Sequence, residues 1–324
     1  MNTIGIDVSK EKLDCAWLKE QDKVKTKVFT NKHSGWQELL DWSLKNTGLA
    51  MAEHHFVMEA TGIYHEQLAT FLTDAGAKVS VVNPAQVKFY AQGLGVRSKN
   101  DKKDSVVLAR YGSKENPTLW QPEAPEIRTL KALLARFDGI EKDLQREKNR
   151  QEKAVISLAP AEVLNSLTDM ISLLETEQQR LDKLIEEHIN KHDKLRENKT
   201  LLESIPAVGK VIATRMLMVI GSRQFDDAHQ CAAYLGLVPV QHESGSSVKG
   251  HARLSKAGNP IIRAKLYMAA VVAIHHNPDI KAQYQRLTSK GKSKMSALGA
   301  AMRKLVQICF GVLKHQQPYQ PQTT

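Results

Sequence analysis

The sequence has few cysteines, and none of them are spaced for a metal or disulfide framework. Cys15, Cys231 and Cys309 stand singly among apolar neighbours, and no C-x-x-C pair occurs. Isolated cysteines of this kind are typical of reduced residues in a hydrophobic core. The sequence therefore predicts neither a zinc site nor disulfide bonds.

Long hydrophobic runs are also absent. No segment approaches 18 apolar residues free of charge, and Asp7 lies where a signal peptide would need its apolar stretch. The 324 residues, of which 42% are hydrophobic, suffice for two or three domains with cores of their own. We therefore expect a cytoplasmic protein with no membrane partner.

Negative charge is scarce in one part of the chain. The net charge is +11, and residues 241–305 hold twelve Lys and Arg against only Glu243 and Asp279, so this segment accounts for +10 of it. Such local imbalance favours a phosphate-binding surface, although a charged run is often only a solvated face. The candidate nucleic-acid-binding residues in this segment are Lys249, Arg253, Lys256 and Arg263.

The first 115 residues alternate between short apolar runs and helical patterns. Strands are predicted at residues 3–8, 13–17, 24–29, 54–58 and 78–82, and helices at 33–45, 63–75, from 84 and from about 101. The order βββαβαβαα predicts an α/β domain in which helices flank a mixed sheet.

Four acidic residues are placed to converge in that domain. Asp7 and Glu59 end two predicted strands, where open α/β sheets bind ligands. Asp101 and Asp104 lie three residues apart in the first turn of a helix, so their side chains share one face. Four carboxylates suit one or two Mg²⁺ ions for phosphodiester cleavage. The plainer alternatives are an exposed strand-end acid, a helix-entry residue and an acidic first turn that complements the helix dipole, with neighbouring lysines as counter-ions.

The second half of the chain is predicted to be mostly helical. Pro117, Pro122 and Pro125 mark a boundary. A seam of mostly apolar residues then recurs at intervals of three and four from Leu164 to His188, with Gln178 and His188 as polar interruptions. This is a coiled-coil seam, which fits either a hairpin within one chain or an arm through which chains associate.

Residues 201–221 have the pattern of a helix-hairpin-helix element. The turn I-P-A-V-G would expose amide groups at the start of its second helix, where Gly209 allows close approach of a phosphate and Lys210 adds charge. An ordinary helical corner is the alternative.

A loop at residues 237–259 contains a candidate nucleophile. Ser244 has basic neighbours, and a serine needs a base or a stabilising cation before it attacks phosphorus. Plain phosphate binding is the other interpretation of such a loop. Ser246 and Ser247 are weaker candidates.

Several motifs resemble one known family. G-I-D-V-S-K, M-E-A-T-G-I-Y and K-N-D-K-K-D are similar to the RuvC-like, RNase H-fold domain of the insertion-sequence 110 family, the DEDD transposases related to Piv-type invertases. Members of this family act as bridge-RNA-guided recombinases. L-G-L-x-P, S-G and K-x-G-N-P-x-x-R resemble its transposase domain, so the similarity spans nearly the whole chain. One departure is Asn100, where the family often has Thr.

The resemblance implies that Asp7, Glu59, Asp101 and Asp104 hold Mg²⁺ and that Ser244, in the S-G position, is the recombination nucleophile. It implies an RNA-guided recombinase that uses a bridge RNA on donor and target DNA, in a bacterial or archaeal cell. The expected domains are an α/β RuvC-like domain (1–115), a linker and coiled-coil arm (116–200) and a mostly α transposase domain (201–324).

We expect a dimer or tetramer in which the acids of one subunit face Ser244 of another. The alternatives are a structure-selective nuclease or junction resolvase that uses water, and a non-catalytic RNA-binding scaffold.

Overall fold

The computed structural model describes residues 2–19, 23–60, 62–95, 100–241, 243–244, 248–249 and 253–322. Of residues 243, 244, 248 and 249 it describes the backbone. The chain divides into two compact units, Met1–Pro122 and Glu123–Thr324, and the second unit contains both the long helices and the C-terminal helices.

The elements of the first unit follow the predicted order, which is confirmed. They are β1 (Asn2–Val8), β2 (Lys12–Leu18), β3 (Val24–Thr30), α1 (His33–Thr47), β4 (His54–Glu59), α2 (Glu66–Asp74), β5 (Lys78–Val82), α3 (Pro84–Gly93) and α4 (Asp101–Glu115), with a short 3₁₀ helix at Met51–Glu53 before β4.

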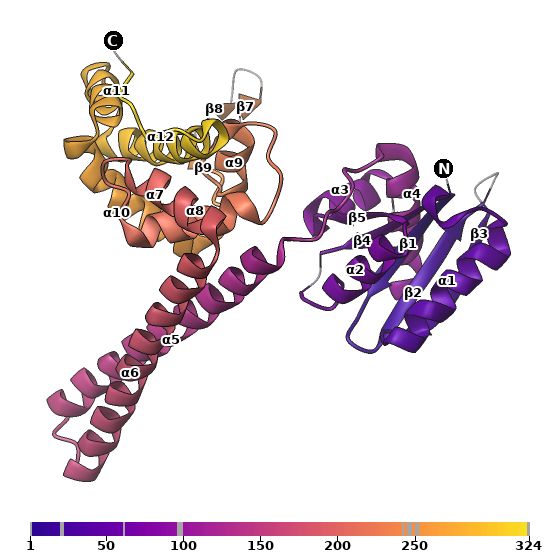
Figure 1. Ribbon diagram of the computed structural model, residues 1–324, viewed down its shortest axis with the longest axis horizontal. Helices are drawn as coiled ribbons and strands as arrows, with labels where there is room; N and C mark the ends of the chain where they lie inside the picture. Colours follow the sequence, from indigo (N-terminus) through magenta and orange to yellow (C-terminus); the bar gives the residue numbers. More distant parts are fainter. Residues whose placement is uncertain are drawn as a thin grey trace. The chain divides into compact units, whose positions relative to one another are not determined.

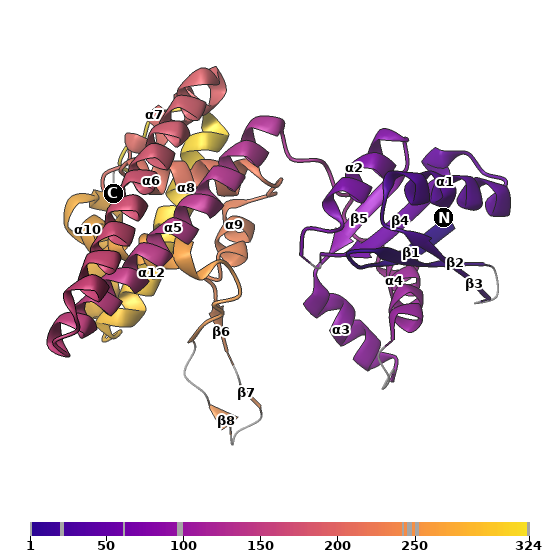
Figure 2. The same ribbon diagram turned by 90° about the horizontal axis from the view of Figure 1, so that it is seen from below.

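These strands form one mixed sheet with the order β3-β2-β1-β4-β5. β1, β2 and β3 are antiparallel, whereas β4 and β5 run parallel to β1. Figure 2 shows α1 and α2 on one face of the sheet and α3 and α4 on the other. Apolar residues of α1 and α2 pack on the first face, around Ile4, Ile6 and Phe56. The topology is RNase H-like, as predicted.

Two glycines let α4 approach the opposite face. A Cβ on Gly5 of β1 would lie 2.1 Å from the carbonyl oxygen of Ser105, and one on Gly112 would lie 2.4 Å from a methyl of Val57 in β4. At Gly5 the helix and the strand therefore touch backbone to backbone, and at Gly112 the helix backbone lies against the side chains of Val57 and Thr3. This contact fixes where the first turn of α4 lies on the sheet.

The second unit is helical apart from short strand pairs. Its helices are α5 (Pro125–Ile156), α6 (Ala161–Lys191), α7 (Asp193–Glu203), α8 (Lys210–Gly221), α9 (Ala228–Tyr234), α10 (Pro260–His276), α11 (Pro278–Ser289) and α12 (Lys294–His315). α12 is long and apolar enough to span a membrane on length and composition alone. Eleven of its residues, however, are buried, and nine of these belong to the hydrophobic core of this unit, as in an ordinary core helix.

The predicted seam on α6 packs inside one chain. Figure 1 shows α5 and α6 running side by side as a hairpin, and the buried Ile171, Leu181 and Ile185 of α6 face α5. The buried part of the seam is therefore used within the chain, as in the hairpin alternative. The long helix ends soon after this seam: α6 ends at Lys191, His192 is extended, and α7 begins at Asp193.

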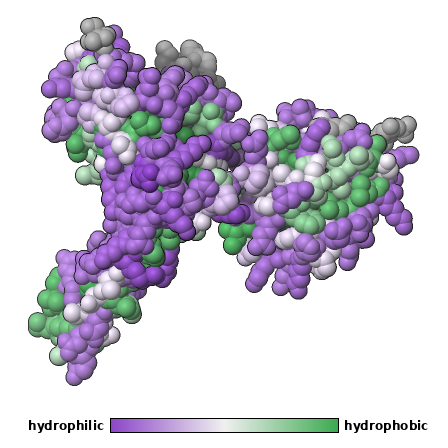
Figure 3. Space-filling view, in the orientation of Figure 1, coloured by the Kyte–Doolittle hydropathy of each residue, from purple (hydrophilic) through white to green (hydrophobic). Residues whose placement is uncertain are grey.

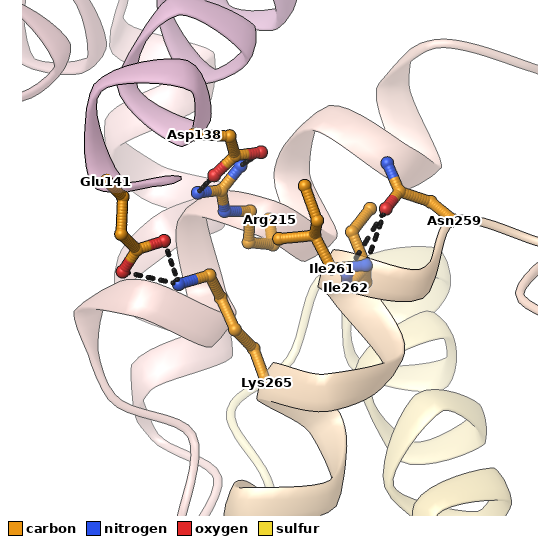
Figure 4. Close-up of polar contacts among 7 residues, drawn as sticks. All are labelled: Asp138, Glu141, Arg215, Asn259, Ile261, Ile262 and Lys265. Atoms are coloured by element: carbon orange, nitrogen blue, oxygen red, sulfur yellow. Dashed lines mark hydrogen bonds and ion pairs between the residues drawn. The ribbon is translucent and has the colours of Figure 1, made fainter. Parts of the chain in front are cut away.

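Ion pairs attach the base of this hairpin to the rest of the unit. Arg215 of α8 donates two hydrogen bonds to Asp138 of α5, with side chains only 5% and 11% exposed, and Lys265 of α10 pairs with Glu141 at 3.0 Å (Figure 4). A buried pair has no water to replace a lost partner, so it fixes α5 against α8. The three cysteines are free and buried, as predicted.

Candidate active site

Three acidic residues lie in a row at the carboxyl end of β1. Asp7 is paired with Asp14 across the β1–β2 ladder. Glu59 ends β4, one residue beyond Met58, which is level with Ile6 in the parallel β1–β4 pair. Since side chains alternate along a strand, Asp7 shares the face of Gly5, which is the face that α4 covers. Glu59 shares the face of Val57 for the same reason, so both acids face α4.

The other two acids are in the first turn of α4. The side chain of Asn100 accepts a hydrogen bond of 2.8 Å from the backbone N–H of Lys103, which caps the helix. Thr and Asn are both good N-cap residues, so Asn100 replaces the Thr common in the family without loss of this function. The cap starts the helix at Asp101 and so places Asp101 and Asp104 above the sheet edge.

The electrostatics of Asp7 show that the acids are brought together. The pKa of Asp7 rises from 3.8 to about 6, first because the half-buried carboxyl loses solvent and then because of nearby negative charges. In order of decreasing effect, those charges belong to Asp101, Asp104, Asp14 and Glu59. Each of these four carboxylates therefore acts on Asp7, and a cation beside Asp7 would be stabilised.

A lysine already supplies positive charge there. The Lys12 ammonium lies 2.7 Å from Asp101 and 3.0 Å from Asp14. Both hydrogen bonds raise the pKa of Lys12 above its ordinary value, and the bond to Asp101 has the larger effect. Lys12, Asp14 and Asp101 line a cavity of about 890 Å³ whose wall also contains Lys102, Lys103 and Arg110.

The residues fit a hard divalent cation in donor type. Carboxylate oxygens are the ligands that Mg²⁺ prefers. Asp7 provides such oxygens, and so do three of the acids whose charges raise its pKa, Glu59, Asp101 and Asp104. Within the described part of the chain, however, no three His, Cys, Asp or Glu side chains lie close enough together to coordinate a metal ion. Part of the reason is visible, since Asp101 is bonded to Lys12 instead.

Sequence reasoning missed Lys12 and Asp14. Asp14 is the one acid in the otherwise apolar run of β2 and is buried, which is a signal in itself. Its partnership with Asp7 depends on the register of the β1–β2 hairpin, and the partner of Lys12 is 89 residues away in the sequence.

The candidate serine lies on a hairpin of the second unit. β6 (Pro239–Val240) pairs with β9 (Arg253–Leu254), and β7 (Glu243–Ser244) pairs with β8 (Val248–Lys249), so that Ser244 is opposite Val248. Figure 2 shows β7 and β8 beyond β6, away from the helices. The alternatives Ser246 and Ser247 lie outside the described residues.

Two glycines join the segments at the base of this hairpin. A Cβ on Gly258 would lie 2.3 Å from the Tyr234 carbonyl oxygen, and one on Gly236, where φ is +71°, would lie 2.7 Å from the Ala257 nitrogen. Only glycine permits this contact, which explains the glycines of L-G-L and K-x-G-N-P. Arg263 donates to the Gly258 carbonyl oxygen, so its side chain braces the same junction.

The predicted nucleic-acid-binding residues have different surroundings. Arg253 and Lys256 are exposed beside the hairpin, and the backbone of Lys249 is in β8. The Lys210 ammonium, however, is 2.7 Å from Asp182 and 3.4 Å from Glu186 of α6. Lys210 and Arg263 thus bond to their own unit, whereas Arg253 and Lys256 face solvent.

The RNase H-like sheet with acids at the carboxyl ends of β1 and β4 is the part of the chain that comparison with known proteins assigns to DNA transposases. A family model described as Transposase matches residues 4–160, and one described as Transposase IS116/IS110/IS902 family matches residues 199–285. The pilin gene-inverting protein of Moraxella bovis is 35% identical over 318 residues, which cover 98% of this chain and 97% of that protein.

The transposase for insertion sequence element IS1111A of Coxiella burnetii is 25% identical over 344 residues, 98% of this chain and 90% of that protein. The chain belongs to the IS116/IS110/IS902 family of transposases, and it is an enzyme of DNA recombination.

Proposed function

We propose that this transposase is an RNA-guided, Mg²⁺-dependent DNA recombinase that cleaves and rejoins strands with a serine nucleophile. The observation that carries the proposal is the placement of the four acids: Asp7 and Glu59 lie on the face of the sheet that α4 covers, and Asp101 and Asp104 lie in the first turn of α4. In this proposal Asp7, Glu59, Asp101 and Asp104 hold the metal. When bound, Mg²⁺ stabilises negative charge on the phosphate and lowers the pKa of the attacking hydroxyl.

The covalent chemistry is assigned to Ser244. Its Oγ attacks a DNA phosphorus and loses its proton, a phosphorus–sugar oxygen bond breaks, and the sugar oxygen leaves as a hydroxyl. A hydroxyl of another strand then attacks the phosphoserine and releases the serine. One phosphodiester is made for each one broken, so exchange needs no external energy source. The similarity to the pilin gene-inverting protein of Moraxella bovis supports such exchange between DNA sites.

Nucleic acid is assigned to the basic C-terminal segment. The exposed Arg253 and Lys256 and the neighbouring Lys249 lie beside the serine hairpin and would contact phosphates of donor and target DNA. Lys210 and Arg263 are proposed to contribute less, since each is bonded within its unit. The family resemblance supports a bridge RNA as guide, in a bacterial or archaeal cytoplasm.

Assembly is proposed to use the end of the α5–α6 hairpin. Apolar residues gather there on the surface in Figure 3, and those next to the turn are exposed: Val155 is 56% exposed, Ile156 76% and Leu158 90%. Such a patch is uncommon on a protein that acts alone. A dimer or tetramer formed in this way would let the acids of one subunit meet Ser244 of another.

A structure-selective nuclease or junction resolvase is the second candidate, because the same acids can activate water. The two functions share the metal and differ in the nucleophile.

The experiment for the proposal is strand cleavage by the protein purified with its RNA. Wild type should cleave donor and target DNA in Mg²⁺, and Asp101→Ala should not, while its circular dichroism is unchanged. Ribonuclease treatment should abolish site choice. Normal cleavage by Asp101→Ala would exclude the acidic site, and unaltered site choice after ribonuclease would exclude the guide.

A further inference from the structure

Lys12 is the first residue of β2, and its backbone is held firmly in the β1–β2 turn. The Ser9 N–H and hydroxyl both donate to the Lys12 carbonyl oxygen, at 3.0 and 2.9 Å. The side chain then reaches across to the first turn of α4. Its ammonium therefore occupies a defined place at the acidic site.

The two carboxylates that Lys12 contacts differ in their exposure to solvent. The Asp14 side chain is 11% exposed and lies on β2 opposite Asp7, so it is fixed by the sheet. The Asp101 side chain is 54% exposed, at the start of a helix. The ammonium thus links an exposed acid to a buried one, 2.7 Å from the first and 3.0 Å from the second.

The oxygen that Lys12 holds is one that a divalent ion needs. Asp101 Oδ2 cannot accept a short bond from an ammonium and donate a lone pair to a metal in the same direction. A monovalent cation at hydrogen-bond distance from a ligand also repels a divalent ion bound beside it. Lys12 and the metal therefore compete for Asp101.

We propose that Lys12 is a built-in counter-ion of the acidic site, which holds Asp101 against Asp14 until a divalent metal displaces it. The inference rests on the proposed function, because it takes Asp101 to be a metal ligand. Asp14 is then a positioning residue: it retains the ammonium near the site after Asp101 turns to the metal. Lys12 sets the metal concentration at which the site fills.

Metal affinity measured without nucleic acid tests this directly. We would titrate the full chain with Mn²⁺ by calorimetry and electron paramagnetic resonance, comparing wild type with Lys12→Gln, Asp14→Asn and Asp101→Asn. Lys10→Gln, which makes the same charge change two residues earlier and outside the two ion pairs, is the matched control. Circular dichroism would check that each variant is folded.

Lys12→Gln should bind Mn²⁺ about three- to tenfold more tightly than wild type and Lys10→Gln, because a competing charge is removed. Asp14→Asn should bind more weakly, because Lys12 then keeps Asp101 as its partner. Asp101→Asn should lose the site. Equal or weaker binding by Lys12→Gln overturns the inference alone, whereas no binding by wild type overturns the proposed metal site as well.

A second measurement follows the ammonium itself. In ¹H–¹⁵N spectra of lysine side chains, assigned with Lys12→Gln, the Lys12 signal of the metal-free protein should shift when Mg²⁺ is added and stay unchanged in Asp101→Asn. A Lys12 signal that does not respond while calorimetry shows Mg²⁺ binding overturns displacement.

Discussion

Gly5 and Ser105 touch through their backbones: a Cβ at Gly5 would lie 2.1 Å from the Ser105 carbonyl oxygen and 2.3 Å from the Ala109 nitrogen. One residue pair thus sets the distance between the strand that bears Asp7 and the helix that bears Asp101 and Asp104. The position of the acids depends on a residue that has no side chain.

Gly5→Ala should therefore impair the acidic site, although Gly5 is not one of its four acids. The added methyl has to push α4 off the sheet, at a cost of about 3 kcal/mol in the free energy of unfolding. Metal affinity should fall, and the rate of strand cleavage should fall by at least the same factor. Gly93→Ala is the control, because a Cβ there meets nothing within 4 Å. Denaturant unfolding and Mn²⁺ titration would check it, and a Gly5→Ala protein with wild-type values of both would contradict the packing account.

Asp7→Asn should stabilise the metal-free protein while abolishing cleavage. The pKa of Asp7 is about 6 in the folded chain against 3.8 for an ordinary Asp, so the unfolded state loses its proton first as the pH rises. Stability is therefore lost between about pH 4 and 6 and remains lower above that range. Removing the charge should recover about 1 to 2 kcal/mol at pH 7.5, a figure reduced for the solvent exposure of the group.

Thermal unfolding of wild type and Asp7→Asn at pH 4 and pH 7.5 would measure this. The difference between the two proteins should be present at pH 7.5 and nearly absent at pH 4. Mg²⁺ should raise the melting temperature of wild type and leave that of Asp7→Asn almost unchanged. A variant less stable than wild type at pH 7.5 without metal would show that repulsion among the acids is not important.

Arg215→Ala should destabilise the second unit strongly. It leaves Asp138 charged and buried, which costs about 3 to 5 kcal/mol. Arg146→Ala removes an exposed pair with Asp143 on the same helix and should cost less than about 1 kcal/mol. Urea unfolding would compare them. The double variant Asp138→Ala with Arg215→Ala should be less destabilised than the sum of the two single changes, and strict additivity would argue against the pair.

The sequence was sufficient to predict the first unit because its signals are local. Alternating apolar residues separate the strands from the helices, and the rule for strand ends placed Asp7 and Glu59 at one edge. The sequence could not predict contacts between residues that are set by strand register or are far apart in the chain. These are the pairing of Asp14 with Asp7 and the ion pair of Lys12 with Asp101. The break between α6 and α7 at His192 contains no Gly or Pro from which it could be predicted. The seam on α6 has the same pattern whether its partner is α5 or a second chain.

Complementation should show whether the site is shared between subunits. Asp101→Ala and Ser244→Ala chains, each inactive alone, should recover part of the recombination activity when assembled together with RNA and DNA. Recovery is expected because each mixed assembly contains one intact pairing of acids with serine. If every mixing ratio remains inactive while the two variants co-assemble, the site is built within one chain.

The most direct measurement is the identity of the atom joined to DNA during cleavage. A nicked substrate that prevents rejoining should trap the intermediate, and mass spectrometry of the digested complex should find a nucleotide on the peptide that contains Ser244. Ser244→Ala should give no adduct, whereas Ser246→Ala and Ser247→Ala should still give one. Cleaved DNA without any protein-linked strand, in Mg²⁺ and with Ser244 intact, would contradict the account and identify water as the nucleophile.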